Sequence, residues 1–357
     1  MKPRVYIVGA GITGCSLAHF LKEDFEVVLY EKSFEIGGLL KTKSNLEGLK
    51  YQSGNQILHT NEEWIISFLK KYIPLREVDF LVSIDPLFDL RYYDFPFTKK
   101  AIDYLPWHWN EAISLDLESV RGHTASNVAK LIQNFYGQTA YDIFYKDLLR
   151  KFLLKDPYHI KDVKWAKKKF LRRIADEEKY FNEQYVYFPV DVGYNDLFHE
   201  FTEGVNVEVN TTITYSDIPR DGQIILTTRP DDFFGGNTDL EYIKTEFDID
   251  SAVHTKNKPD LVFYPNYTPF ICINQFGRFF QGEKNIVSKI YHSLNDGFDT
   301  YPVHTSKNIE TYKKLYESFS NEVLFVGPKA SYQFMDVADC ISAASNVAAK
   351  LKHKRTK

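Results

Sequence analysis

A glycine-rich turn between two strand-like segments is the feature that most constrains how this chain can fold. Residues 4–8 are a short run of β-branched and aromatic side chains, residues 15–22 have the apolar spacing of a helix, and residues 26–30 are again strand-like. The sequence Gly9-Ala10-Gly11-Ile12-Thr13-Gly14 joins the first run to the helix. This order predicts a strand–helix–strand unit at the N-terminus.

The three glycines of this turn have the spacing of a dinucleotide-binding site. Gly9 permits the tight turn, Gly11 lets a pyrophosphate approach the backbone, and Gly14 permits close packing of helix on strand. The N-terminus of the helix then faces the phosphates. Glu31 follows the second strand, where an acid accepts hydrogen bonds from a ribose diol. The complete order favours a nucleotide site over a plain glycine-rich turn with an exposed glutamate.

A second glycine pair distinguishes between cofactors. Gly37-Gly38 lies six residues beyond Glu31. NAD-dependent Rossmann domains do not require this pair, whereas the segment resembles the FAD-binding signature of flavoproteins of the glutathione-reductase and amine-oxidase type. We therefore predict FAD rather than NAD. The cofactor contacts predicted in this part of the chain are Gly9, Gly11, Gly14, Glu31, Lys32, Gly37, Gly38 and Leu39.

Composition excludes several other classes of protein. A hydrophobic share of 44%, with 18 Gly and 14 Pro, is that of a folded globular chain. The net charge of -4 provides no positive field for nucleic acid. The sequence contains no run of about 18 apolar residues, so no membrane span is predicted. Cys15, Cys272 and Cys340 are an odd number without metal-type spacing. We expect free thiols in a reducing cytoplasm, with no disulfide and no zinc.

The rest of the chain alternates between helical and strand-like patterns. Residues 124–181 have helical periodicity and few Gly or Pro, which predicts an inserted helical bundle. A strand at 321–327 leads into an Ala-rich helix at 337–351, expected to return to the N-terminal domain and close over the flavin. Further strands are predicted at 205–214, 223–228 and 260–264. The domains are therefore expected to be interleaved.

Along most of its length the chain resembles the UDP-galactopyranose mutase family of flavoenzymes. Individual motifs are loose, but their order is shared with the family. After the N-terminal signature come Tyr51 to Asn61, Tyr93-Asp94-Phe95-Pro96, Tyr180-Phe181-Asn182, Pro189 with Gly193-Tyr194, Pro230 to Phe234, Leu240-Glu241-Tyr242, Tyr301-Pro302-Val303 with Asn308 and Tyr312, and Gly327 to Val337.

The resemblance implies an α/β fold in three parts. A Rossmann-like FAD-binding domain is expected from residues 1–77, 196–235 and 318–357, a helical domain from 100–180, and an antiparallel sheet domain from 78–99, 181–195 and 236–317. It also implies a ring-contracting and ring-expanding mutase for a nucleotide-activated sugar, used in polysaccharide or glycan biosynthesis. Reduced FAD would provide the reacting nitrogen without net redox change. A homodimer is left open.

The resemblance further assigns roles to individual residues. Arg173, His59 and Tyr301 are the expected catalytic residues, and the guanidinium of Arg173 suits a diphosphate clamp. His59, Gly327, Asp336 and Val337 are added to the cofactor site. The expected substrate contacts are Arg173, Tyr180, Tyr301, Lys151, Arg278 and Tyr332.

The departures from the family pattern concentrate on the substrate side. The segment whose aromatic residues hold uridine in the family is represented by 148–154, Leu-Leu-Arg-Lys-Phe-Leu-Leu. Cys272 and Pro328 stand where the family has arginine, Phe334 where it has a phosphate-binding tyrosine, and Gln56 where it has a histidine near the flavin. Several lost charge-assisted contacts, each worth about 1.5–3 kcal/mol, predict changed substrate recognition with retained cofactor chemistry.

Simpler explanations stand beside these roles. Arg173 lies in a basic run that is typical of a solvated helix face. His59 is as well explained as a structural histidine, and Asp336 as an N-cap of the terminal helix. Two other functions also stay open: a flavin oxidoreductase of the amine-oxidase-like superfamily, and a flavin-binding protein that has lost its activity.

Overall fold

The computed structural model describes most of the chain. The described residues are 2–53, 56–86, 91–119, 124–171, 180–190, 193–235, 238–253, 259–276, 279–280, 284–295 and 297–355. Arg173 and Arg278 lie outside them.

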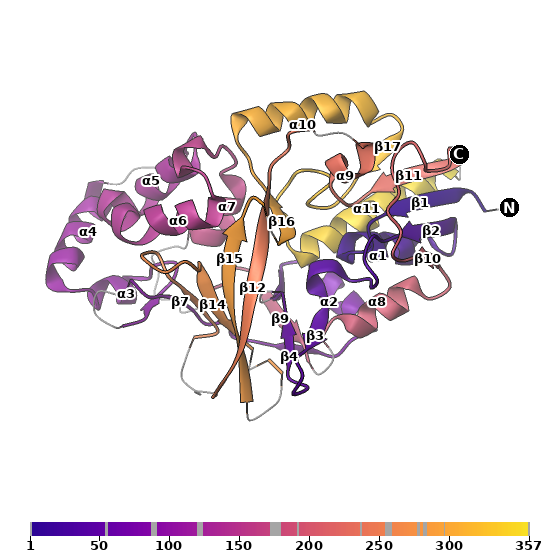
Figure 1. Cartoon of the computed structure of the whole chain (residues 1–357). Coiled ribbons are helices and arrows are strands. Elements are labelled where there is room, and N and C mark those ends of the chain that lie inside the picture. Colours follow the sequence, from indigo (N-terminus) through magenta and orange to yellow (C-terminus); the bar gives the residue numbers. More distant parts are fainter. Residues whose placement is uncertain are drawn as a thin grey trace.

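A twisted parallel sheet holds the N-terminal segment. Its strands β1 (Arg4–Val8), β2 (Glu26–Tyr30), β10 (Asn206–Glu208), β11 (Gly222–Leu226) and β17 (Val323–Phe325) pair in the order β10-β2-β1-β11-β17. Parallel sheets are normally covered on both faces, so their strands are apolar on both sides. Accordingly, Val5 and Ile7 face one buried cluster, and Tyr6 and Val8 face another. Both termini lie at this end of the molecule (Figure 1).

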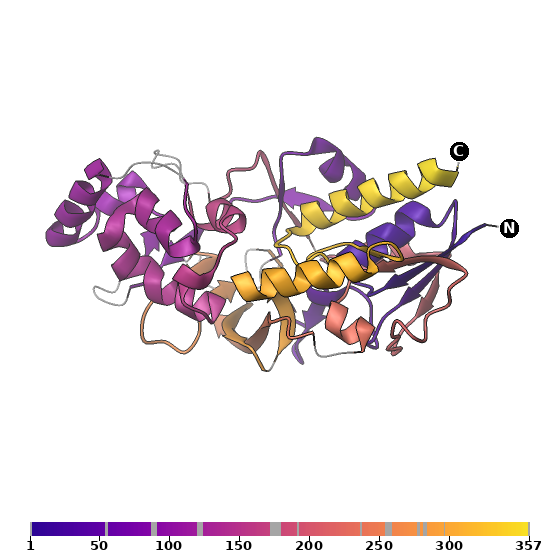
Figure 2. The same cartoon turned by 90° about the horizontal axis from the view of Figure 1, so that it is seen from above.

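Two helices from opposite ends of the chain pack together on this sheet. Helix α1 (Ile12–Leu21) contacts α11 (Val337–Arg355), as Figure 2 shows from above. Small buried side chains, Ala338, Ala344 and Ala348, allow the close approach. Helices α2 (Glu63–Leu69) and α8 (Asn195–Thr202) complete this face, and α9 (Pro230–Phe234) lies against the other cluster. The predicted return of the C-terminal segment to the N-terminal unit is therefore observed.

A largely antiparallel sheet occupies the middle of the molecule (Figure 1). Its strand order is β16-β12-β15-β14-β13-β7-β8, and only the β13–β7 pair is parallel among those with described register. The strands are β7 (Val82–Ile84), β8 (Tyr93–Asp94), β12 (Tyr242–Val253), β13 (Leu261–Phe263), β14 (Cys272–Gln275), β15 (Lys284–Ser293) and β16 (Phe298–Pro302).

The helical part lies at the end opposite the termini (Figure 1). It comprises α3 (Lys99–Asp103), α4 (Trp107–Ser119), α5 (Val128–Ala140), a π-helical turn η2 (Tyr141–Tyr145), α6 (Lys146–Leu153), a 3₁₀ turn η3 (Pro157–His159) and α7 (Lys164–Phe170). The Asn127 side chain caps α5 by accepting from the Lys130 amide at 2.9 Å. The apolar faces of α5, η2 and α6 share one core with the inner face of the antiparallel sheet.

Several short elements and one longer helix connect these parts. They are η1 (Gly38–Leu40), the pair β3 (Thr42–Ser44) and β4 (Lys50–Gln52), the sheet β5-β9-β6 (Leu58–Thr60, Tyr185–Pro189, Leu75–Glu77), and α10 (Ser306–Phe319). The main sheets draw on segments from both halves of the chain, as interleaved domains require. The residue boundaries predicted for the three domains stay a prediction.

One predicted strand is much shorter than expected. The pattern at 205–214 predicts a strand of that length, but only Asn206–Glu208 pairs with β2. After Glu208 the chain turns back: the amides of Asn210 and Thr211 donate to the carbonyls of Ser33 and Glu31. An apolar pattern does not show where neighbouring strands stop.

We expect Gly14→Ala to destabilise the apoprotein, with Gly11→Ala as the matched control. A methyl group at Gly14 would collide with the Gly9 carbonyl, whereas one at Gly11 would meet nothing within 4 Å. Overpacking should cost about 1–3 kcal/mol or more, and Gly11→Ala should stay within about 1 kcal/mol of the natural protein. Urea unfolding followed by circular dichroism measures both. Equal stability of the two variants would contradict the close packing of α1 on β1.

Candidate functional site

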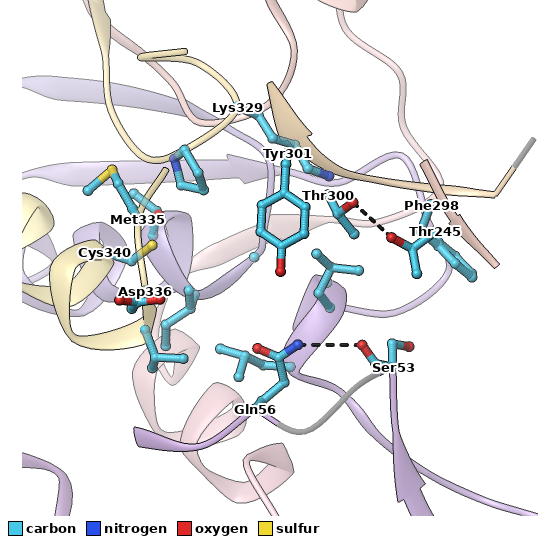
Figure 3. A pocket seen from close by; sticks show the side chains of 18 of the residues that line it. Ser53, Gln56, Thr245, Phe298, Thr300, Tyr301, Lys329, Met335, Asp336 and Cys340 are labelled. Carbon is cyan, nitrogen blue, oxygen red and sulfur yellow. Dashed lines mark hydrogen bonds between the residues drawn. The ribbon is translucent and has the colours of Figure 1, made fainter. Parts of the chain in front are cut away.

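A continuous cleft of about 1140 Å³ runs between the three parts of the molecule. The glycine turn and Glu31 line one end, and α7 and the inner face of the antiparallel sheet line the other. Figure 3 shows the middle of this cleft, where the hydroxyl of Tyr301 points into the open space and Asp336 and Gln56 lie on its walls. Residues predicted separately for cofactor and substrate therefore meet in one cavity.

The glycine turn is shaped by close backbone contacts. Gly9 has φ +104°, in the left-handed region, and the Thr227 hydroxyl donates to its carbonyl at 2.9 Å. Gly14 packs on that same carbonyl. Gly11 faces the cleft with free space above it, and the first turn of α1 has no side-chain cap. The turn therefore leaves room and helix amide donors for a phosphate group.

The carboxylate of Glu31 is held at the end of β2 by two amides. The amide of Ala10 donates to Oε2 and the amide of Ser33 to Oε1, each at 2.8 Å. These bonds orient the carboxylate at the wall of the cleft, and a carboxylate has further lone pairs for a diol. Neighbouring Lys32 also lines the cleft and pairs with Asp232 at 3.1 Å.

A cluster of charged groups lies where α11 begins. His59 Nδ1 is 3.2 Å from a Glu183 oxygen, and its Nε2 is 3.6 Å from Asp336. Lys168 reaches Asp336 at 2.5 Å and Asp339 at 3.5 Å. Burial alone would raise the pKa values of Glu183 and Asp336, but His59 and Lys168 lower both. Both carboxylates are therefore ionised at neutral pH.

An aromatic wall closes the other end of the cleft. Trp165 stacks on Phe152 with a centroid distance of 5.7 Å and on Phe334 at 4.4 Å. Phe334 in turn stacks on Tyr301 at 5.1 Å. All four line the cleft. The segment 148–154 was expected to lack the aromatic contacts that hold uridine in the family. Phe152 within this segment, on α6, nevertheless provides an aromatic face to the cleft, and so does Trp165 on α7, which the sequence analysis did not single out.

Lys169 is a cleft residue that sequence reasoning missed. Its ammonium lies 4.9 Å from the Phe152 ring centre and 5.6 Å from that of Tyr301. Burial alone would lower its pKa, but Tyr301, Tyr180 and Asp336 raise it, so the side chain is a cation. Within the described ranges its ammonium forms no ion pair and no hydrogen bond. The sequence could have indicated Lys169 as a site residue, because it lies four residues after Trp165 and therefore on the same face of the helix.

Most of the predicted site residues that the structure describes line the cleft. Gly14 and Gly327 do not line it; Gly14 packs on Gly9, and a methyl group at Gly327 would meet the Thr13 side chain at 2.6 Å. Tyr332 lines it, but its hydroxyl donates to the carbonyls of Glu241 and Val303. The predicted residues that line the cleft are Gly9, Gly11, Glu31, Lys32, Gly37, Gly38, Leu39, His59, Tyr180, Tyr301, Tyr332, Asp336 and Val337.

Lys151 is not placed as predicted. It does not line the cleft; its ammonium donates to backbone carbonyls of the segment 264–270, including Asn266 at 2.9 Å and Phe270 at 3.2 Å. Burial lowers its pKa to about 8. Leu148 and Leu153 are core residues and likewise do not line the cleft. All three residues lie on α6, and sequence order alone does not show which face of this helix points toward the cleft.

The fold and the cleft define a dinucleotide-binding α/β protein with a second, antiparallel sheet over a shared site. A family model for UDP-galactopyranose mutase matches residues 143–334, more than half of the chain, and one for an NAD(P)-binding Rossmann-like domain matches 7–72. The chain belongs to the UDP-galactopyranose mutase family. Within the described residues, no helix has both the length and the apolar character to cross a membrane.

Individual proteins are similar to the chain in sequence or in fold. The UDP-galactopyranose mutase of Mycoplasma genitalium is 35% identical over 83 residues, which are 22% of this chain and 20% of that protein. A crystal structure of reduced UDP-galactopyranose mutase superposes with a TM-score of 0.83 at 13% identity, covering 100% of this chain and 95% of the other. Putrescine oxidase with bound putrescine gives 0.62 at 13% identity and 99% coverage of both chains. These structural matches show the fold.

We expect Glu183→Gln to lower stability at pH 7 and to have little effect in acid. The folded-state pKa of Glu183 lies below its ordinary 4.5, so its stabilisation is complete above pH 4.5 and disappears as the pH falls through that lower value. A loss of about 1–3 kcal/mol at pH 7 is expected. Urea unfolding between pH 3 and 7 measures it, with the exposed Glu317→Gln as control. A loss that is the same at every pH would contradict the charge network.

Proposed function

We propose that this protein is a flavin-dependent mutase that interconverts the ring forms of a nucleotide-activated sugar of the UDP-galactopyranose and UDP-galactofuranose kind, in polysaccharide or glycan biosynthesis. The supporting observation is the single cleft that joins a dinucleotide site to a cationic, tyrosine-lined region in a member of this family. Without that continuity, a cofactor at one end could not reach a substrate at the other.

FAD fits the residues at the first end of the cleft. Gly11 leaves open space at the uncapped start of α1, and Glu31 presents a fixed carboxylate to a ribose diol. A methyl group added at Gly38 would lie 3.4 Å from the Gly11 Cα, so a larger residue there would narrow this space. Leu39 and Val337 would contact the cofactor from the two sides of the cleft. Bound reduced FAD would supply a nucleophilic nitrogen for ring isomerisation without net redox change.

The substrate's diphosphate would bind between Lys169, Tyr180 and Tyr301. All three line the cleft, and Lys169 is electrostatically coupled to both tyrosines. The cation would neutralise the diphosphate, and the hydroxyls would donate to its oxygens. This site lies against the aromatic wall, where water is excluded and such contacts strengthen. Arg173 and Arg278 stay proposed anion contacts outside the described residues; Lys151 is withdrawn from this role by its placement.

The charge cluster would position the groups around the reacting sugar. Asp336, ionised and paired with Lys168, holds the start of α11 at the cleft wall. His59 is fixed between two carboxylates and stacks on Phe181 at 4.1 Å. Either of its ring nitrogens can hold a proton there. We propose His59 as a group that orients the cofactor or substrate, with Tyr301 nearer the diphosphate.

The natural substrate is proposed to differ from UDP-galactopyranose. Cys272, Pro328 and Phe334 all line the cleft where the family pattern has arginine, arginine and tyrosine. This half is therefore less cationic and more apolar than the family pattern. The cofactor half keeps its glycines and Glu31, and a decayed protein would be expected to change on both sides alike.

An oxidoreductase is the second candidate function. The same fold is found in putrescine oxidase and in a Methanosarcina mazei oxidoreductase, the latter with a TM-score of 0.61 at 12% identity, covering 97% of this chain and 100% of the other. A likeness of fold does not select a reaction. A flavin-binding protein without activity is the third, and the assay below separates all three.

We expect purified protein to be yellow and to release FAD on denaturation. Gly11→Ala should reduce FAD retention because its methyl group would occupy the phosphate space while the fold is kept. Glu31→Arg should do the same by placing a cation at the ribose diol. Absorbance at about 450 nm relative to protein measures both. A colourless natural protein that takes up no flavin on reconstitution would refute the proposed cofactor.

Turnover tests the reaction itself. Dithionite-reduced protein, incubated with UDP-galactofuranose and a panel of other nucleotide sugars, should convert one of them to its other ring form, separable by chromatography. The oxidised protein should be inactive. Efficient use of UDP-galactofuranose would contradict the altered substrate recognition. Hydrogen peroxide or NAD(P)H turnover would indicate the oxidoreductase, and bound FAD without any chemistry would indicate the inactive protein.

Lys169→Met should weaken binding of the diphosphate. Losing one charge-assisted contact of about 1.5–3 kcal/mol should raise the Kd for UDP roughly 10- to 100-fold, while FAD stays bound. Lys167→Met is the matched control, since Lys167 is on the same helix and does not line the cleft. Calorimetric titration with UDP measures both. An unchanged Kd in Lys169→Met would remove Lys169 from the site.

A further inference from the structure

Lys168 joins the helical part of the molecule to the start of α11. Its ammonium lies 2.5 Å from Asp336, 3.5 Å from Asp339 and 3.7 Å from Glu183. All four side chains line the cleft. Lys168 comes from α7, whereas the two aspartates lie at the start of the last helix of the chain. One cation therefore faces three carboxylates that come from other parts of the fold.

The ion pairs keep Lys168 positively charged. Burial alone would lower its pKa, but the three carboxylates together raise it. Burial would likewise raise the pKa values of Asp336 and Glu183, and His59 and Lys168 lower both. Lys168 therefore offsets part of the negative charge of this cluster. Without its ammonium, the cluster would be more negative by one unit.

The cluster lies between the two ends of the cleft. Cys340, in the first turn of α11, forms a side-chain hydrogen bond with Thr13 in the first turn of α1. The start of α11 therefore lies beside the proposed phosphate site, and Figure 3 shows Asp336 and Cys340 together on one wall of the cleft. In the other direction, Lys168 is followed by Lys169, which reaches the aromatic wall. The cluster thus marks the junction of the cofactor and substrate ends.

The redox-active ring of bound FAD would lie toward this junction. The carboxylate of Glu31 and the open space at Gly11 suit the ribose and the pyrophosphate of the adenosine half. The flavin half is joined to the other end of the pyrophosphate, so it extends away from Glu31 along the cleft. This step rests on the FAD of the proposed function.

We propose that Lys168 sets the reduction potential of the bound flavin by offsetting the carboxylates at the start of α11. Reduction adds two electrons and one proton to the ring, so the reduced form carries one more negative charge than the oxidised form. Charges near the ring tune its electronics. A nearby cation favours the reduced form, and nearby carboxylates disfavour it. Because the proposed mutase works with reduced FAD, Lys168 would hold the cofactor in its active form at less negative ambient potentials.

The test is the midpoint potential of the flavin at pH 7, measured without any substrate. Dithionite supplies the electrons in a stepwise titration beside an indicator dye of known potential. At the midpoint of the natural protein, Lys168→Met should lower the ratio of reduced to oxidised flavin about tenfold, the effect of one unit charge about 10 Å away at an effective dielectric constant of about 20. For a two-electron couple this ratio corresponds to a potential lower by about 30 mV.

Four further variants separate charge from structure. Lys168→Arg keeps the charge and should retain the natural potential. Asp339→Asn removes one negative charge but keeps an oxygen that can accept from the Asp336 amide, so it should raise the ratio about tenfold. Lys168→Met combined with Asp339→Asn should return close to the natural potential because the two charge changes cancel. Lys167→Met, on the same helix but outside the lining of the cleft, is the matched control.

Each outcome decides between the alternatives. Retained FAD with an unchanged potential in Lys168→Met would overturn this proposal and leave the proposed function intact. An equal change in Lys168→Met and Lys168→Arg would indicate that Lys168 only holds α7 against α11. If Lys168→Met does not fold, Asp339→Asn still decides, because an unchanged or lowered potential there would refute the electrostatic role.

The same measurements distinguish this proposal from the proposed function. A natural protein that binds no flavin would overturn both. Opposite shifts in the two single variants, in a reduced protein that shows no mutase turnover, would support the role of Lys168 and refute the proposed reaction.

Discussion

The close approach of Gly14 to the Gly9 carbonyl is the contact on which the rest of the site depends. It places α1 directly over β1, so the uncapped first turn of the helix opens toward the cleft. Thr227 is the residue that follows β11, and its hydroxyl donates a hydrogen bond to the same carbonyl. This bond links a segment that is distant in sequence to the glycine turn. Helix α11 then packs on α1 and brings Asp336 to the cavity. One backbone contact thereby aligns segments from the start, middle and end of the chain.

The second half of the cleft is organised by aromatic packing and isolated charge. Trp165, Phe152, Phe334 and Tyr301 come from separate elements and form one wall. Lys169 is held beside this wall as a cation by its tyrosine and carboxylate neighbours. An aromatic wall excludes water, and a charge in that environment interacts strongly with an opposite charge. We propose that Lys169 provides the attraction for an anion that arginines provide in the family pattern.

The residues predicted for the cofactor lie side by side along the cleft because most of them belong to a short stretch of chain. Gly9, Gly11 and Glu31 belong to a single strand–helix–strand unit, and they line the cleft together. The substrate side was predicted less well. The segment 148–154 was interpreted as a loss of aromatic contacts, although Phe152 within it lines the cleft and Trp165 joins it from α7. Lys151, expected to face an anion, instead binds backbone carbonyls.

The sequence by itself determined the dinucleotide unit, the returning terminal helix and the family resemblance, because each rests on residue spacing that local backbone geometry obeys. Only the tertiary structure decided which side of each helix faces the cleft and which polar atoms stay without partners. Lys169 acquires its surroundings from Phe152 on α6 and Tyr301 on β16, and Trp165 stacks between Phe152 and Phe334. Burial and electrostatic coupling depend on distances in space, and no spacing along the chain encodes them.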